Sequence, residues 1–356
     1  MSNIEKLKKI LNNENNAGAV IFSPVNRRYF TGFQSSAGFL LVTSSGALFL
    51  TDSRYLEAAQ NTIKECAVME LINAKQQITD FFNENKVDTI LFESERLYVS
   101  DFERMKAFFD TKQPISNGSL DKIIDEMRAV KSSFEVECIK KAQEISENAF
   151  SFILDFIKEG VTERQTALEL DFFMLKNGAD ALSFDTIVVS GKNSSLPHGV
   201  PSDKKIQKGD FITMDFGAVY SGYHSDMTRT VFLGEPSKEQ VFVYETVLSA
   251  QKAALSTLKH GALGVSSDKA ARDVIENAGF GKFFRHGTGH GVGLEVHENP
   301  TLSPKSEHTL TIGNVVTVEP GIYLPKKFGV RIEDMAFITK DGYENLTGST
   351  KELICL

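Results

Sequence analysis

The chain has 356 residues, of which 41% are hydrophobic, so it is long enough for two globular domains. Its formal net charge is −8 with acidic and basic residues interspersed, which argues against nucleic acid as the main ligand, because that binding needs a concentrated basic face. No apolar run approaches the length of a membrane span, and the charged, amphipathic N-terminus lacks the apolar core of a signal peptide. We therefore expect a soluble, cytoplasmic protein with no membrane or nucleic-acid partner.

Residues 1–125 alternate short strand-like and helix-like segments, as α/β domains do. The predicted strands are residues 18–22, 38–44, 47–52, 67–71 and 88–93, and helical segments are predicted at 55–63 and 101–109. Residues 111–133 mix turn formers with charged residues, and no element is predicted there. We place the domain boundary in this segment, which gives domains 1–125 and 126–356.

The second part begins with a long predicted helix, residues 134–158. A second helix follows, and its first turn has the capping-box pattern from Thr162 to Gln165. The remaining predicted elements are a strand at 185–191, a hairpin at 211–232, helices at 238–259 and 266–278, and strands at 314–324 and 330–339. Two helices followed by strands therefore occur twice, which suggests a duplicated unit in an α+β domain.

The predicted hairpin places two aspartates close together. A turn centred between Tyr220 and Ser221 pairs residues whose numbers sum to 441, and Asp215 and Asp226 satisfy that sum. Their Cβ atoms would then lie about 5 Å apart, an arrangement in which like charges destabilise the sheet. A shared proton, a basic neighbour such as Arg229 or a bound metal would offset the repulsion.

Histidines gather in and just beyond the glycine-rich stretch at 284–300, at His286, His290, His297 and His308. A single histidine in such a loop is more often a hydrogen-bonding surface residue, but the clustering favours a site. The glycines at 287, 289, 291 and 293 let the backbone pass close to a ligand or to another strand. His290, between two of these glycines, is the main candidate ligand.

Glu319 and Glu333 each interrupt an apolar, strand-like run. Acidic residues in such runs are rarely buried unless they are paired or bound to a cation. Glu319 alternatively faces solvent on an edge strand beside Pro320. Glu333 alternatively pairs with Arg331, which lies two residues earlier and therefore on the same face.

Together, four carboxylates and one imidazole match two divalent cations in charge: Asp215, Asp226, His290, Glu319 and Glu333. Oxygen-rich ligation with one imidazole suits Mn²⁺, Co²⁺ or Fe²⁺, and Zn²⁺ less well. We expect Mn²⁺, with the other three ions as alternatives. Two such ions about 3.5–4 Å apart generate hydroxide near neutral pH and polarise a carbonyl, so the pattern predicts a hydrolase.

The same residues, within "MDFGA", "YHSDMTRT", "HGTGHGVG", "TVEPGIY" and "VRIED", resemble the dinuclear metallopeptidases of the pita-bread fold, over residues 130–356. The first part is similar to the N-terminal domain of creatinase, prolidase and aminopeptidase P, through "RRYFTGF" (27–33) and "TDSRYLEAA" (51–59). Methionine aminopeptidases lack that domain, so the resemblance implies the Xaa-Pro-cleaving branch. The implied fold class is α+β, an α/β domain followed by a pita-bread domain with a pseudo-duplicated helix-strand unit.

The resemblance also implies a role for each residue. Asp215 would chelate one metal ion, Asp226 and Glu333 would bridge both, and His290 with Glu319 would complete the ligand shell of the second metal ion. Glu319 would also act as the catalytic base.

Five further residues match family positions around the substrate. His198 in "LPHG" and His297 in "VHENP" match the two histidines that contact the substrate and stabilise the tetrahedral intermediate. His286, Tyr323 and Arg331 match pocket positions, and Arg331 would orient Asp215. The chain has no Trp, so an aromatic wall of the kind some family members use would need Phe or Tyr from the N-terminal domain.

The expected function is therefore Xaa-Pro aminopeptidase activity, with peptides that carry proline at the second position as substrates. The main alternative is an Xaa-Pro dipeptidase (prolidase), which is restricted to dipeptides. A metal-free, creatinase-like amidine hydrolase and a non-catalytic binding module are further alternatives, and retention of all five ligand positions argues against both. The family resemblance also implies a homodimer.

Overall fold

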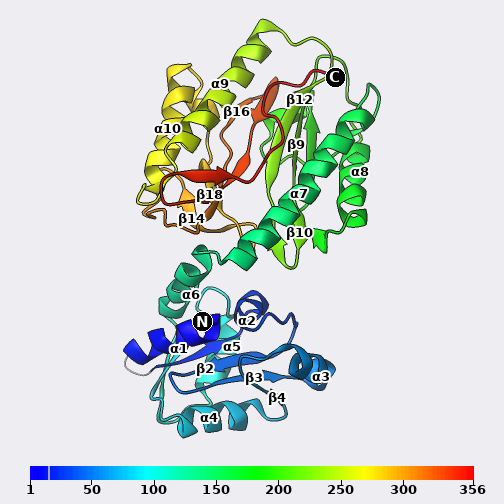
Figure 1. The fold of residues 1–356 in the computed structure, drawn as a ribbon. Coiled ribbons are helices and arrows are strands. Elements are labelled where there is room, and N and C mark those ends of the chain that lie inside the picture. The colour runs from blue at the N-terminus through cyan, green and yellow to red at the C-terminus, as the bar shows by residue number, and fades with distance from the viewer. Residues whose placement is uncertain (15–16) are drawn as a thin grey trace. The chain divides into compact units, whose positions relative to one another are not determined.

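The computed structural model describes residues 1–14 and 17–356. The chain divides into two compact units, Met1–Arg128 and Ala129–Leu356, which are described separately below (Figure 1). Among the described residues, no helix is long and apolar enough to cross a membrane.

Unit 1 is built on one mixed six-stranded sheet in the order β4-β3-β2-β1-β5-β6. Its strands are β1 (Gly18–Ile21), β2 (Phe39–Val42), β3 (Ala47–Thr51), β4 (Ala67–Glu70), β5 (Thr89–Phe92) and β6 (Gln113–Ile115). Its helices are α1 (Asn3–Asn13), α2 (Pro24–Thr31), α3 (Ser53–Thr62), α4 (Ala74–Glu84), α5 (Val99–Lys106) and α6 (Ser119–Ala129), the last ending at the unit boundary. The central strand β1 is buried at every position, which explains its continuous apolar sequence.

Helix α6 lies in the segment 111–133, for which the sequence analysis named no element. Gly118, with φ +84°, makes the turn that precedes the helix. Leu120, Ile124 and Arg128 are buried at a spacing of four residues, which is the period of one helix face. The turn formers at the start of the segment concealed this pattern.

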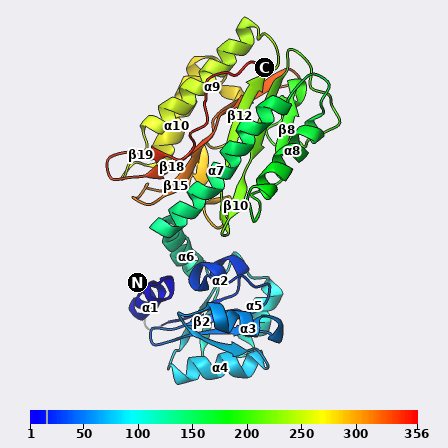
Figure 2. The same cartoon turned by 45° about the vertical axis from the view of Figure 1, so that its right-hand side comes forward.

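Unit 2 has two pairs of helices with strands between them, as Figures 1 and 2 show. The pairs are α7 (Ser133–Phe156) with α8 (Glu163–Lys176), and α9 (Lys238–Ser256) with α10 (Gly264–Asn277). Each pair packs on its own apolar core cluster, so two helix-strand layers face each other as the predicted duplication requires. The predicted capping box from Thr162 to Gln165 is present at the start of α8.

The strands of unit 2 form four small sheets, β12-β9-β8, β11-β10-β7, β14-β13-β15-β18-β19 and β16-β17. Their bounds are β7 (Ala181–Leu182), β8 (Ile187–Ser190), β9 (Phe211–Phe216), β10 (Ala218–Tyr220), β11 (Tyr223–His224), β12 (Met227–Phe232), β13 (Gly289–Gly291), β14 (Glu298–Leu302), β15 (Val315–Val318), β16 (Gly321–Leu324), β17 (Phe328–Arg331), β18 (Asp334–Ile338) and β19 (Tyr343–Asn345). Two short 3₁₀ helices, η1 (Gly191–Ser195) and η2 (Gly281–Phe283), complete the unit.

The hairpin exists, but its predicted register is wrong by two residues. Asp215 pairs with Thr228 rather than with Asp226, so paired residue numbers sum to 443. The turn is Ser221–Gly222, whose φ values of 49° and 81° are both positive, as a type I′ turn requires. Because side chains alternate with a period of two, this shift keeps the same side chains on the same face.

Each of the last two predicted strands is in fact two strands. The run 314–324 divides into β15 and β16, and 330–339 divides into β17 and β18, with each half in a different sheet. The breaks fall at Glu319 and Pro320 in the first run and at Ile332 and Glu333 in the second.

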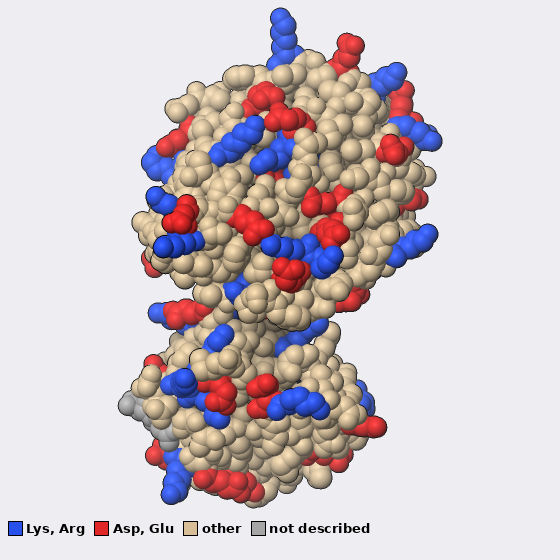
Figure 3. Space-filling view, in the orientation of Figure 1, with Lys and Arg blue, Asp and Glu red and all other residues tan. Residues whose placement is uncertain are grey.

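Lysine and arginine side chains lie among aspartates and glutamates over the face of the molecule shown in Figure 3. Opposite charges in such proximity leave this face with little net attraction for a polyanion.

Candidate metal centre

A cavity of about 450 Å³ in unit 2 collects the residues that the sequence singled out. Its lining includes all five predicted metal ligands, Asp215, Asp226, His290, Glu319 and Glu333, together with His198, His286, His297 and Arg331. Tyr323 lies just behind the lining, in contact with His286 and Arg331. His308 is not in the cavity, and its ring lies beside Thr301.

Asp215 is held by Arg331, as expected from the sequence. The Arg331 Nη2 atom lies 2.6 Å from Asp215 Oδ2, and both side chains are largely shielded from solvent. Burial raises the pKa of Asp215, and the charge of Arg331 opposes this effect. The second oxygen, Oδ1, is buried without a hydrogen-bond partner among the described residues. An unpaired buried carboxylate oxygen is a candidate for binding a cation.

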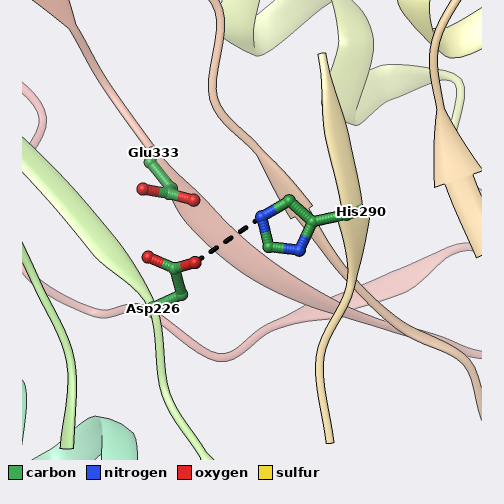
Figure 4. A group of neighbouring side chains, drawn as sticks. All are labelled: Asp226, His290 and Glu333. Atoms are coloured by element: carbon green, nitrogen blue, oxygen red, sulfur yellow. Dashed lines mark ion pairs between the residues drawn. The ribbon is translucent and has the colours of Figure 1, made fainter. Parts of the chain in front are cut away.

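Asp226, His290 and Glu333 form the tightest group in the cavity, and one donor atom from each lies within 4.8 Å of the others (Figure 4). His290 Nε2 lies 3.6 Å from Asp226 Oδ2. Its Nδ1 is 3.0 Å from the carbonyl oxygen of Gly291, which only accepts, so Nδ1 carries a proton and Nε2 is the ring nitrogen directed at the carboxylates.

The carboxyl groups of Asp226 and Glu333 both have pKa values well above the ordinary range. Burial is the main cause for each, and neighbouring carboxylates add to it, Glu333 for Asp226 and Glu319 for Glu333. Glu333 also accepts a hydrogen bond of 2.7 Å from Thr228 Oγ1. Like charges in one buried pocket therefore resist ionisation, and this resistance disappears when a cation is bound.

Glu319 shows the opposite shift. Burial alone would raise its pKa, but the hydrogen bond and charge of His290, at 3.3 Å, outweigh burial and lower the pKa to about 2. The pKa of His290 is raised, because its contact with Glu319 exceeds the effect of its own burial. Each of these two side chains therefore favours the charged form of the other.

Three side chains connect the cavity wall in a hydrogen-bonded chain. Arg331 Nη1 donates to the Tyr323 hydroxyl at 2.9 Å, and that hydroxyl lies 3.1 Å from His286 Nε2. His286 Nδ1 lies 2.8 Å from the carbonyl oxygen of Gly287, so Nδ1 is the donor and Nε2 accepts from Tyr323. Burial lowers the pKa of His286, which favours the neutral ring that this chain needs.

His198 and His297 stand on two different loops at the cavity. The ring of His297 packs edge-on against that of His290, with centroids 4.3 Å apart. His198 lies on the exposed loop after η1. The cavity lining also includes the apolar side chains of Phe184, Ile187 and Val296.

Sequence reasoning missed Thr228, which joins two parts of the site. Its hydroxyl donates to Glu333 and accepts from Arg331 Nε at 3.0 Å. The correct hairpin register would have revealed it, because Thr228 is the residue opposite Asp215. Arg229, which the sequence offered as a neighbour for the two aspartates, instead pairs with Asp334 at 2.8 Å.

The donor set therefore fits divalent cations. Four carboxylates and one imidazole converge, three of the carboxylates have raised pKa values, and one oxygen lacks a partner. Oxygen donors with a single imidazole are the ligands that hard and borderline divalent ions prefer.

Family comparison agrees with this chemistry. Residues 137–340 match the model of metallopeptidase family M24, and residues 3–130 match the creatinase/prolidase N-terminal domain. The chain belongs to metallopeptidase family M24. Its helix-strand layers in unit 2 are the pita-bread arrangement of that family, so the expected fold class is confirmed.

Curated relatives and solved structures match this chain over nearly its full length. An uncharacterized peptidase of Bacillus subtilis is 42% identical over 99% of each chain. The solved structure of an Xaa-Pro dipeptidase from Bacillus anthracis has a TM-score of 0.94 at 40% identity, over 99% of each chain. The structure of an X-Pro aminopeptidase from Thermotoga maritima has a TM-score of 0.91 at 39% identity, over 100% of each chain.

Proposed function

We propose that this chain is a metal-dependent hydrolase of the bond between an N-terminal residue and a following proline. The observation that carries the proposal is the convergence of four carboxylates and His290 on one cavity, with Asp215 Oδ1 unpaired. Relatives named for Xaa-Pro hydrolysis resemble the chain over its whole length and support this substrate class.

We assign the metal ligands as the sequence predicted them. Asp215 would hold one ion, and Asp226, Glu333, His290 and Glu319 would complete the ligand set for two ions. When bound, two divalent ions lower the pKa of water and polarise the scissile carbonyl. We expect Mn²⁺, with Co²⁺, Fe²⁺ or Zn²⁺ as alternatives, because oxygen donors dominate the set.

The chain's own side chains perform the other steps. Glu319, whose Oε1 lies 3.3 Å from His290 Nε2, would accept the proton of the attacking water. His198 and His297, on the cavity loops, contact the substrate and stabilise the charge that develops on its carbonyl oxygen. Arg331 fixes Asp215 and, through Tyr323, the ring of His286.

Aminopeptidase activity on longer Xaa-Pro peptides is our first assignment, and dipeptidase activity is the second. The similarity to the Bacillus anthracis Xaa-Pro dipeptidase specifically favours the second. The two activities differ in the substrate that the cavity accepts. An aminopeptidase accepts a peptide that continues beyond proline, whereas a dipeptidase accepts only a proline that ends in its free carboxylate. The homodimer, the cytoplasmic location and an aromatic wall from the N-terminal domain stay predictions from the sequence.

The deciding experiment removes metal with a chelator and restores Mn²⁺, Co²⁺, Fe²⁺ or Zn²⁺ in turn. Hydrolysis of an Xaa-Pro dipeptide is then compared with that of an Xaa-Pro-Yaa tripeptide, with Xaa-Ala-Yaa as the control substrate. Metal-dependent cleavage of the proline tripeptide establishes the aminopeptidase, and cleavage of the dipeptide alone establishes the dipeptidase. Folded, metal-loaded protein that cleaves neither would contradict the proposal.

A further inference from the structure

The loop that carries His198 is held in place by residues other than His198 itself. The loop runs from the end of β8 through η1 to Ser202. Among the residues that the structure describes, the His198 ring has no hydrogen-bond partner, and the residue is exposed. Its place at the cavity therefore depends on how the loop backbone is held.

Glu163, the first residue of α8, holds both ends of this loop. Its side chain is fully buried, at 0% exposure. At the start of the loop, Oε1 accepts from Ser190 N at 2.7 Å, from Ser190 Oγ at 3.0 Å and from Asn193 Nδ2 at 3.1 Å. At its far end, Oε2 accepts from Ser202 Oγ at 2.5 Å and from Ser202 N at 3.2 Å. One carboxylate thus closes the loop across its base.

Backbone pairing reinforces the same closure. Glu163 N donates to the carbonyl of Lys204, and Arg164 N donates to that of Ser202, at 3.1 and 3.0 Å. The Lys204 ammonium donates to Ser190 Oγ at 2.8 Å, so a cation lies one hydroxyl away from the buried carboxylate. Such a charge-assisted arrangement is stronger than neutral hydrogen bonds.

The tip of the loop meets the metal-binding side of the cavity at two points. Gly329 N donates to Ser194 Oγ at 2.8 Å, and a Cβ atom on Gly329 would lie only 2.1 Å from the carbonyl oxygen of Ser194, so the two backbones are in close contact. Arg331 Nη1 donates to the carbonyl oxygen of Pro197, next to His198, at 3.1 Å. A loop pinned at its base by Glu163 and at its tip by Arg331 keeps little freedom.

We propose that Glu163 is a positioning residue, which fixes His198 for catalysis by clamping the base of its loop. This inference rests on the proposed function, in which His198 contacts the substrate. Glu163 itself does not line the cavity and is not among the metal candidates, so its effect passes through the loop.

The Glu163→Gln variant tests the clamp with almost no change of shape. The amide puts an NH₂ group against Ser and Asn donors, so about half of the accepted hydrogen bonds are lost and buried donors remain unpaired. A displaced catalytic group of this kind lowers turnover by about 10- to 100-fold. We expect that fall in kcat, a smaller change in KM and unchanged metal stoichiometry.

Glu93→Gln is the matched control. Glu93 is also at 0% exposure and accepts from Ser23 N, Ser23 Oγ, Phe22 N and Asn26 Nδ2, but it lies in unit 1. This variant loses the same kind of buried hydrogen bonds, all of them to donors in unit 1. It should lose stability while the folded protein keeps its kcat.

A double-mutant cycle separates positioning from a merely structural effect. If Glu163 acts through His198, then Glu163→Gln costs little further activity in a His198→Ala background, because the group it positions is already gone. If the fold-losses in kcat of the two single variants multiply fully in the double variant, the inference is overturned. Wild-type kcat in a folded Glu163→Gln protein would overturn it as well.

Hydrogen exchange gives a readout that does not need activity. The amides of Ser190 and Ser202 both donate to Glu163, so their exchange should accelerate in Glu163→Gln and stay unchanged in Glu93→Gln. Unchanged exchange would contradict the clamp even if the wild type cleaved no Xaa-Pro peptide, which keeps this failure distinct from failure of the proposed function. If Glu163→Gln does not fold, Ser202→Ala releases one end of the loop and should give the same effects in smaller measure.

Discussion

The substitution Asp226→Asn should change the stability of unit 2 in opposite directions with and without metal. Asp226 is only 5% exposed, and burial, followed by the charge of Glu333, raises its pKa. The nearest cationic atom is His290 Nε2 at 3.6 Å, beyond hydrogen-bond reach. The isosteric amide therefore removes a like charge from the cavity and sacrifices no hydrogen bond.

Without metal, the free energy of unfolding should rise by about 0.5–2 kcal/mol, the usual gain when a functionally constrained site is relieved. Bound metal adds about 2.7 kcal/mol to the wild type at a free concentration one hundred times its Kd. If Asp226 is a metal ligand, as proposed, the Asp226→Asn variant forgoes this gain. With metal, the wild type should therefore be the more stable protein by about 0.7–2.2 kcal/mol. This difference is the stabilisation by bound metal minus the stability that the variant gains without metal.

The assay is thermal or urea unfolding in EDTA and in saturating Mn²⁺. For a unit of the size of Ala129–Leu356, each kcal/mol of unfolding free energy moves Tm by about 2–4 °C. The reversal in the order of stability between wild type and variant is therefore measurable. Asp334→Asn is the control, because Asp334 is equally buried but paired with Arg229 and Lys351. It should destabilise the protein under both conditions.

Two results would refute the reasoning on Asp226. Loss of stability in EDTA would mean that its carboxylate is not under electrostatic strain. Equal stabilisation of wild type and variant by Mn²⁺ would mean that Asp226 is not a ligand.

Three further outcomes are expected. Arg331→Met should cost about 3–5 kcal/mol in urea unfolding, because it leaves a buried carboxylate unpaired, and a cost under 1 kcal/mol would show that the Asp215 contact is dispensable. In the native protein at pH 8, the exposed Cys355 should react first with a thiol reagent. Burial raises the pKa of Cys66 to about 11, which leaves only about one thiolate in a thousand, so its labelling rate should rise tenfold per pH unit up to that pKa, and a flat rate would contradict the shift. Ser221→Gly should stabilise the hairpin by about 0.4–1 kcal/mol in urea unfolding, since Ser221 has φ 49°, and a loss would show that its side chain contributes more than its backbone costs.

The sequence predicted the elements and the candidate ligands better than their pairing. Long, capped helices such as α7 were recognisable because periodicity and caps are local signals. The register of the Asp215 hairpin was wrong by two residues, because the I′ turn depends on positive φ at Ser221 and Gly222, and the pattern of apolar residues is the same for both registers. A shift of two preserves the face, so the inference that the two aspartates meet in one cavity survived the error.

What the sequence did not predict involves contacts between distant residues. Thr228 joins Glu333 to Arg331 over more than one hundred positions, and only the correct hairpin register, which was predicted wrongly, would have pointed to Thr228. The clamp by Glu163 was equally hidden, because a glutamate in the first turn of a helix is common for reasons of charge alone.

The strand breaks explain why the carboxylates of Glu319 and Glu333 can reach the cavity. Glu319 and Glu333 stand where a continuous apolar run leaves one sheet and enters another. At such a break the side chain is released from the alternation of the pleat and can point into the space between sheets. The backbone stays satisfied, since Glu319 N donates to Thr288 O and Glu333 N to Thr228 O. An acidic residue within an apolar run is therefore itself evidence for the break, because a continuous strand would either bury its charge unpaired or expose the apolar neighbours.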